Sequence, residues 1–503
     1  MSTDSHTRNT RLVTLAVFLQ VFLAAMDNTI ISTAMPTVVA ALGGMRWYSW
    51  VFSVYLMAST IATPIAGKLS DQFSRKRIYL LSISAFLIAS MLCGFAPNMT
   101  WLIFARLAQG LAAGTMFAVS LGLTAILYPP HQRGKVQGIL SSLWAIASII
   151  GPVLGGYVVE HFSWRWTFYL NLPLGLLALT FIGRYLHEPE QKSERQQIDY
   201  RGAATLAATV TGLLYLVTNY DQLQTPWLVA GALLIAFLFM LLLHIEREAA
   251  APILPFALLR RKEIAAANLA TFSTGIGAFG LILFAPLFVQ GVLLRPATEA
   301  GLVLLPFSFG WAGGSMASGH LVNRLGYRNL AVLGAVLMIS GNVLLGVLNV
   351  ASTLFAVAAG CGLAGFGMGM VTTAITVSVQ NNVSAHELGV ATASTIFSRA
   401  LGAATGTSIL GAMLALRLGN LLKEFFPQNP AGAITEIRSL LLREMRTQIS
   451  PDVLAQMQHG LAQALRTVFQ ACVVASVFAL FVALRVSAHR PRTEVAQPVM
   501  AES

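Results

Sequence analysis

The chain has 503 residues, of which 56% are apolar and only 10% are charged, and its formal net charge is +12. Soluble domains carry about a quarter charged residues, so this composition excludes an ordinary soluble protein and indicates an integral membrane protein. The basic residues lie in short segments between apolar stretches, which excludes a basic nucleic-acid-binding domain. The three cysteines fall inside apolar stretches and have no spacing typical of metal sites or disulfides.

Apolar windows of about 20 residues, long enough to cross a bilayer as a helix, predict an all-α membrane protein with fourteen spans. The expected spans are 12–35, 48–67, 78–96, 101–127, 135–159, 164–184, 202–219, 226–245, 264–290, 300–322, 329–348, 353–378, 389–415 and 467–486. The first is too long for the apolar core of a signal peptide, so we expect no cleavable signal.

Most of the lysines and arginines lie in the segments on the same side as the N-terminus. The positive-inside rule therefore predicts that the N-tail (1–11) and the C-tail (487–503) are both cytoplasmic. We expect a multipass protein of the bacterial inner (cytoplasmic) membrane, with the lipid bilayer as its surroundings.

An internal repeat divides the chain. Residues 67–77 follow the second span and residues 319–328 follow the tenth, and both read Gly-x-Leu-x-(Asp/Asn) followed by basic residues. Parallel repeats of this kind are a transporter architecture. They predict two six-helix halves, 12–184 and 264–486, around a central segment, 185–263, whose two extra helices form a peripheral hairpin.

Asp27 lies within the first apolar span and is the one acid expected in mid-membrane. A charge there costs roughly 2.5–3.5 kcal/mol on insertion scales, and intramembrane acids usually mark ion or proton pathways. Burial favours the protonated carboxyl, so Asp27 is a candidate to take up a proton on one side and release it on the other. The alternative is an acid satisfied by a structural hydrogen bond.

Two further patterns have a mechanical interpretation. In the loop after the second span, Asp71 can cap a helix or pair with Arg75 or Arg77 to hold a cytoplasmic gate near Gly67; plain positive-inside topology is the alternative. In the fifth span, Gly151-Pro152-x-x-Gly155-Gly156 removes side chains and bends the helix. Close packing there would seal the outer side, although generic small-residue packing is the alternative.

These patterns resemble the major facilitator superfamily, specifically its fourteen-helix drug:proton antiporter branch. The resemblance rests on four patterns: Asp27-x-Thr29 with Ala34-Met35-Pro36; Gly67 to Arg77; Arg106-x-x-Gln109-Gly110; and Gly151 to Gly156, continuing to Trp164-Arg165-Trp166 and Asn171-x-Pro173. Ser32, Gln72 and Ser74 depart from the family pattern, and the last two make the loop turn less ideal.

The resemblance implies alternating access and proton-coupled export of small lipophilic compounds or drugs. It implies no cofactor, because the proton gradient drives transport. It also implies that Asp27 and Arg106 face one cavity, so that ion pairing and protonation compete. An arginine that only binds backbone carbonyls is the alternative for Arg106. An exporter dedicated to one metabolite, such as a siderophore or antibiotic, is the alternative function.

The implied substrate pocket lies at the midplane between the halves, and its candidates are largely neutral side chains. They are Gln20, Gln137, Trp144, Asn268, Phe272 and Arg399, and each has simple packing as its alternative. Trp144 and Trp311, both mid-span, could stack on a ligand. The lack of a second mid-membrane acid argues against divalent cationic substrates, and the absence of a phosphate-binding Gly-rich loop or metal-ligand cluster argues against an enzyme.

The outer loop 416–466 is unusually long. Ser450-Pro451 is a typical helix start, and Val453, Met457, Leu461 and Leu465 form an apolar stripe. We expect a helix lying on the membrane, or alternatively a docking surface for a periplasmic adaptor protein.

Overall fold

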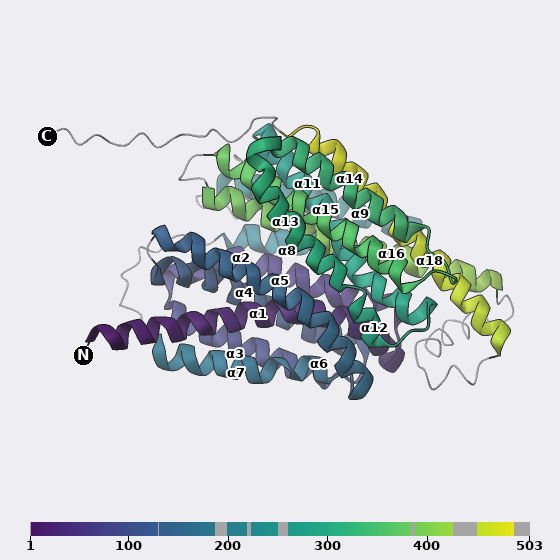
Figure 1. The fold of residues 1–503 in the computed structure, drawn as a ribbon, viewed down its shortest axis with the longest axis horizontal. Helices are drawn as coiled ribbons and strands as arrows, with labels where there is room; N and C mark the ends of the chain where they lie inside the picture. The colour runs from purple at the N-terminus through teal and green to yellow at the C-terminus, as the bar shows by residue number, and fades with distance from the viewer. Residues whose placement is uncertain are drawn as a thin grey trace.

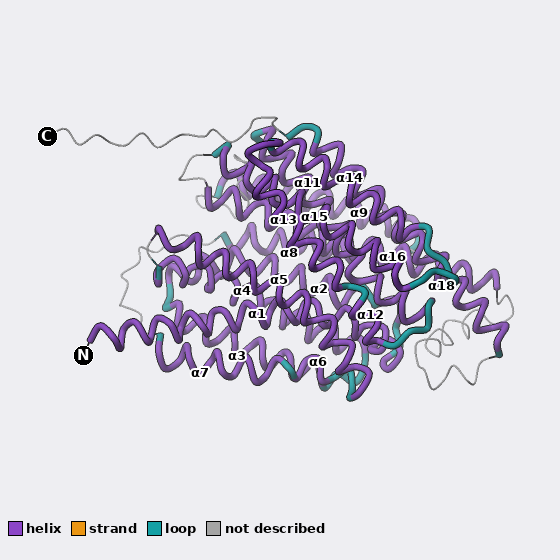
Figure 2. Tube along the Cα trace, viewed as in Figure 1, coloured by secondary structure: helices purple, strands orange, loops and turns teal. Residues whose placement is uncertain are grey.

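The computed structural model describes residues 2–128, 130–186, 199–218, 223–249, 260–383, 388–425 and 450–486. Within them all regular secondary structure is helical (Figure 2). Twelve of the described helices are long and apolar enough to cross a membrane. Two more, α5 (Pro130–His161) and α8 (Tyr200–Thr218), occupy the remaining expected spans. The predicted all-α membrane fold is therefore confirmed.

The N-terminal half is built from six long helical segments. They are α1 (Ser2–Leu42), followed by the short η1 (Met45–Trp47), α2 (Trp50–Gln72), α3 (Arg75–Gly94), α4 (Met99–Leu127), α5, and the pair α6 (Trp166–Tyr169) and α7 (Asn171–Tyr185). α1 packs against α5 and α7, whereas α4 packs against α2 and α3.

The C-terminal half repeats this packing order. Its helices are α11 (Lys262–Leu287) with the π-helical turn η2 (Phe288–Val292), α12 (Ala297–Leu302) with α13 (Leu305–Leu325), α14 (Tyr327–Gly346), α15 (Leu354–Asn381), α16 (Leu388–Phe425) and α18 (Pro451–Ala483). α11 packs against α16 and α18, whereas α15 packs against α13 and α14. Gly67 and Gly319 thus lie at corresponding places, near the ends of α2 and α13.

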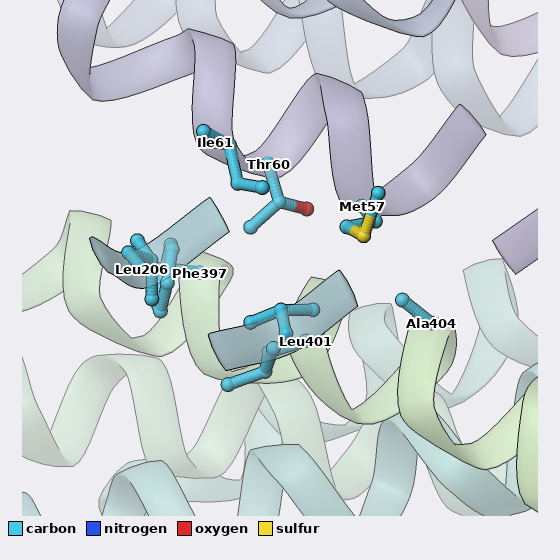
Figure 3. A pocket seen from close by; sticks show the side chains of 8 residues that line it. Met57, Thr60, Ile61, Leu206, Phe397, Leu401 and Ala404 are labelled. Carbon is cyan, nitrogen blue, oxygen red and sulfur yellow. The ribbon is translucent and has the colours of Figure 1, made fainter. Parts of the chain in front are cut away.

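The two central helices, α8 and α9, differ from each other in their surroundings. α8 packs against α2 of one half, α16 of the other, and α9 (Thr225–Glu248). The space between α2, α8 and α16 is lined mainly by apolar side chains, including Met57, Leu206 and Leu401 (Figure 3). α9 is exposed along most of its length, as expected of a helix that faces lipid.

The last helix differs from the expectation. α18 begins at Pro451 as predicted but continues without a break to Ala483. The prediction of a separate helix lying on the membrane is therefore wrong. Met457, Leu461 and Leu465 are at most 1% exposed, because this stripe packs against the C-terminal half. The stripe is therefore not an open surface for lipid or for an adaptor. The loop residues 426–449 lie outside the described part of the chain.

The two halves meet at the end of the bundle opposite the start of α1, on the right in Figure 1. In the described part of the chain, every side-chain hydrogen bond between the halves comes from the helix segments near this end. The bonds are Tyr48 to the Leu283 carbonyl (2.9 Å), Ser53 with Thr407 (2.8 Å), Gln290 to the Thr33 carbonyl (3.0 Å), Ser308 to the Ser148 carbonyl (2.7 Å), and Thr298 with Glu160. We call this the closed end; the distribution of basic residues predicts that it is the outer one.

The glycine cluster of α5 lies at this junction. A side chain at Gly151 or Gly155 would collide with α1, and one at Gly156 would collide with the backbone of Ala297 and Thr298 in the other half. The cluster therefore permits both the α1–α5 contact and the contact between halves.

Replacing Gly156 with valine is expected to open the closed end. The added carbons meet backbone atoms of α12, which cannot move aside without separating the halves, and overpacking of this kind costs about 1–3 kcal/mol. Spin labels at the exposed positions Phe162 and Leu302 should report a longer distance in the Gly156→Val protein. Gly419→Val, where the added carbon has open space around it, is the matched control; an unchanged distance in both proteins would refute the prediction.

Candidate functional site

Asp27 lies in the middle of α1 and turns into the N-terminal half, where it is 1% exposed. Its Oδ2 accepts a hydrogen bond from Nη1 of Arg106 at 2.6 Å, which is also a salt bridge. Its Oδ1 accepts from the side-chain amides of Gln109 (3.1 Å) and Asn171 (2.8 Å). Helices α1, α4 and α7 thus converge on one carboxyl group.

Arg106 is fully buried on α4. Besides Asp27 it donates to Oε1 of Gln109 (2.8 Å) and to the Val51 carbonyl (3.4 Å), and its guanidinium lies 4.0 Å from the centre of the Tyr55 ring. The ion pair and the backbone contact, which the sequence left as alternatives, are both present. The ion pair is the shorter contact.

Ser90 on α3 fixes the orientation of both amides. Its hydroxyl donates to the Phe168 carbonyl (2.8 Å) and accepts from Gln109 (3.3 Å) and Asn171 (2.9 Å). Since the hydroxyl proton is already used, the amides must present N–H groups to it, and the same NH₂ groups reach Asp27. A carboxylate only accepts hydrogen bonds, so this arrangement fits the ionised form of Asp27.

The network leaves two buried atoms without a protein partner, namely Nη2 of Arg106 and Oδ1 of Asn171. An unsatisfied buried polar atom costs about 1–3 kcal/mol. The ionised arrangement is therefore held by a strong ion pair but is not fully satisfied. The free Oδ1 is an acceptor beside Asp27, available to a protonated carboxyl after rotation of the amide.

Three members of this network were given no role from the sequence. Gln109 follows Arg106 by three residues and so shares its helix face, which is a signal that could have found it. Asn171 stood in a motif on a distant helix, and no local pattern marked Ser90. Only the packing of α3 and α7 brings these side chains to Asp27.

The candidate pocket residues do not form one cluster. Gln20 is 1% exposed inside the N-terminal half, where it accepts from Tyr79 and Ser120, so it does not face the boundary between halves. Asn268 bonds to Ser394 (3.2 Å) and Ser398 (2.6 Å) of α16 within the C-terminal half.

The remaining pocket candidates divide into two sets. Phe272 and Arg399 are half-buried, and the Arg399 guanidinium lies 5.9 Å from the centre of the Trp311 ring. The side chains of Gln137 and Trp144 lie outside the described residues.

In the loop motif, Ser74 caps α3 by accepting from the backbone N–H of Arg77 (3.3 Å), and Arg75 donates to the Ser70 carbonyl (3.0 Å). The turn was expected to be less ideal because Ser74 replaces a glycine. The structure instead uses the serine as a helix cap, whereas the second repeat uses Gly326 at φ 78°. The side chain of Asp71 lies outside the described residues.

Comparison with known proteins extends these observations. Residues 17–407 match the Major Facilitator Superfamily. The chain is 34% identical to the multidrug transporter protein MdtP of Bacillus subtilis over 84% of this chain and 79% of that protein. It is 30% identical to multidrug resistance protein 3 of the same organism over 98% of each.

Among solved structures, a bacterial homologue of the human lysosomal transporter Spinster, in an inward-facing and unoccupied conformation, superposes with a TM-score of 0.67. The superposition covers 97% of this chain and 98% of the other chain, and the two sequences are 15% identical. The similarity is therefore one of fold alone. The sequence matches carry the assignment: the chain belongs to the major facilitator superfamily and is a membrane transporter of small molecules, not an enzyme.

Proposed function

We propose that this protein is a proton-coupled antiporter that exports small lipophilic compounds across the cytoplasmic membrane, with Asp27 as the proton-carrying group. The observation that carries the proposal is the buried Asp27–Arg106 pair at 2.6 Å, enclosed by amide donors. The names of the two related proteins, a multidrug transporter and a multidrug resistance protein, support drugs as the transported compounds.

Protonation of Asp27 removes the charge that holds Arg106. Breaking a buried pair leaves an uncompensated charge and costs about 3–5 kcal/mol, so the neutral acid favours a rearrangement in which Arg106 finds other acceptors. Such a rearrangement moves α1 relative to α4 and α7, because the three helices meet at this carboxyl.

The closed end lies within reach of that movement. Thr33, whose carbonyl accepts from Gln290 of the other half, is six residues from Asp27 on α1, which is about 9 Å along the helix. Thr29 also contacts the Ala147 carbonyl of α5 at 3.3 Å. The protonation state of Asp27 can therefore be coupled through α1 to the contacts between the halves.

The ionised, closed arrangement corresponds to the step after proton release. With the outer end closed, a compound enters from the cytoplasmic side; the halves then exchange access, the compound leaves, and an external proton resets Asp27. Proton entry and substrate export then occur in opposite directions through alternating access.

Asp27→Asn is expected to abolish efflux driven by a pH gradient while the protein still inserts in the membrane. The amide keeps the shape of the site but cannot exchange a proton. Dye efflux from everted vesicles, with and without a collapsed gradient, measures the effect. Asp452→Asn, an exposed acid in the first turn of α18, should transport normally; full gradient-driven efflux by the Asp27 variant would defeat the proposal.

Asn171→Leu is expected to lower gradient-driven efflux. The substitution removes one of the two donors to Oδ1 of Asp27, and a hydrogen bond to a charged group contributes about 1.5–3 kcal/mol. The arrangement of α1 against α7 is weakened as a result, and dye efflux from everted vesicles measures the effect.

The matched control for this variant is Asn342→Leu, which removes a buried asparagine bonded to Ser476 in the other half. It should leave the efflux rate unchanged. Equal rates for wild type and the Asn171 variant, or an equal loss in both variants, would exclude the role of Asn171.

A further inference from the structure

The charges in the middle of the membrane do not balance. The charged residues well inside the described spans include Asp27, Arg106 and Arg399; Arg466, midway along α18, donates to the Gly346 carbonyl at 3.1 Å. The first two neutralise each other at 2.6 Å, and no acid in the described part of the chain pairs with Arg399. Charged side chains inside membranes almost always face a partner or a water-filled cavity, so the unmatched arginine needs an explanation.

The helix position of Arg399 directs it to the boundary between the halves. Three residues on, Gly402 packs against the backbone of Phe272 in α11. Eight residues on, Thr407 bonds to Ser53 of α2 in the other half. At 3.6 residues per turn, Arg399 lies between these two faces, about 60° and 80° from them, and about two turns inward of the Ser53–Thr407 contact.

Trp311 reaches the same boundary from α13. Ser308, one turn earlier, donates to the Ser148 carbonyl of the N-terminal half at 2.7 Å. α15 packs against both α13 and α16. The Arg399 side chain extends from α16 toward α13, and its guanidinium lies 5.9 Å from the centre of the Trp311 ring. Both side chains are half-buried, just inward of the closed end.

The chemistry of this pair selects anions. A guanidinium 5.9 Å from a ring centre has its N–H edge available, and that edge matches a carboxylate or sulfonate with two parallel hydrogen bonds. The indole offers an apolar face to an aromatic or lipophilic body. Asp27, enclosed by the N-terminal half, provides no counter-charge for a cation at this boundary.

We propose that Arg399 and Trp311 bind the anionic group and the adjoining ring of the transported compounds, so that the substrates are lipophilic organic anions. This proposal rests on the export function proposed above and names its substrate class. The anion would neutralise Arg399 when it binds from the cytoplasmic side, and the negative interior of the cell would favour its outward movement.

The test compares two probes of nearly the same size and shape, the anion pyrene-1-butyrate and its uncharged amide, pyrene-1-butanamide. Their binding to the purified full-length protein in lipid nanodiscs is measured by fluorescence anisotropy. The wild-type protein should bind the carboxylate at least about tenfold more tightly than the amide. One hydrogen bond to a charged group typically changes an affinity by this factor or more. Arg399→Gln should lose this preference, and Arg399→Lys should retain part of it.

Two further variants separate the contributions. Trp311→Leu should weaken both probes together, because it removes the stacking surface. Arg466→Gln is the control for removing an arginine from a spanning helix, since Arg466 bonds to the Gly346 carbonyl on another face, and it should keep the preference. If the Arg399 variants do not fold, the wild-type comparison decides alone.

Equal wild-type affinities for the two probes, or a preference that survives Arg399→Gln, would overturn the proposal. Its failure is distinct from failure of the export function. The Asp27→Asn protein should keep the anion preference in binding while losing gradient-driven export. A preference for the anion without any gradient dependence of transport would leave this site standing and refute the proton coupling.

Discussion

The buried ion pair between Asp27 and Arg106 is the constraint on which the N-terminal half depends. A carboxylate and a guanidinium can remain charged inside a membrane protein only if each is the other's partner and further donors complete the shell. Gln109, Asn171 and Ser90 complete it, and they require α1, α3, α4 and α7 to converge at one depth. In the proposed function, the same requirement makes the half sensitive to a single proton.

This chemistry is separated from the surface where the halves meet. The carboxyl faces the interior of one half, while the hydrogen bonds between halves are carried by residues of α1, α2, α5, α11, η2, α12, α13 and α16 and by Tyr48 just before α2. α1 belongs to both sets, with Asp27 and Thr33 less than two turns apart. Proton and substrate therefore need not share a site, and α1 is the element through which one can affect the other.

The two halves share a packing order but differ in charge. The N-terminal half encloses a neutral pair, whereas the C-terminal half presents one unmatched arginine beside an indole at the boundary. In a low-dielectric interior such an asymmetry favours one sign of ligand over the other. In the proposed function, the repeated fold supplies the framework for alternating access, and the charges distinguish the roles of its halves.

The sequence alone determined the helices and the position of the one acid in mid-membrane, because bilayer thickness sets the length of an apolar span and the cost of burying charge makes an exception visible. Gln20 precedes Asp27 by seven residues, about two helical turns, so the sequence also places the two on one helix face. Only the tertiary structure decided that this face looks into the N-terminal half, that Asn171 and Ser90 join the site, and that α18 continues through its stripe into the last span. A helix that is apolar on all sides carries no pattern that fixes its rotation, so packing between helices determines which residues meet.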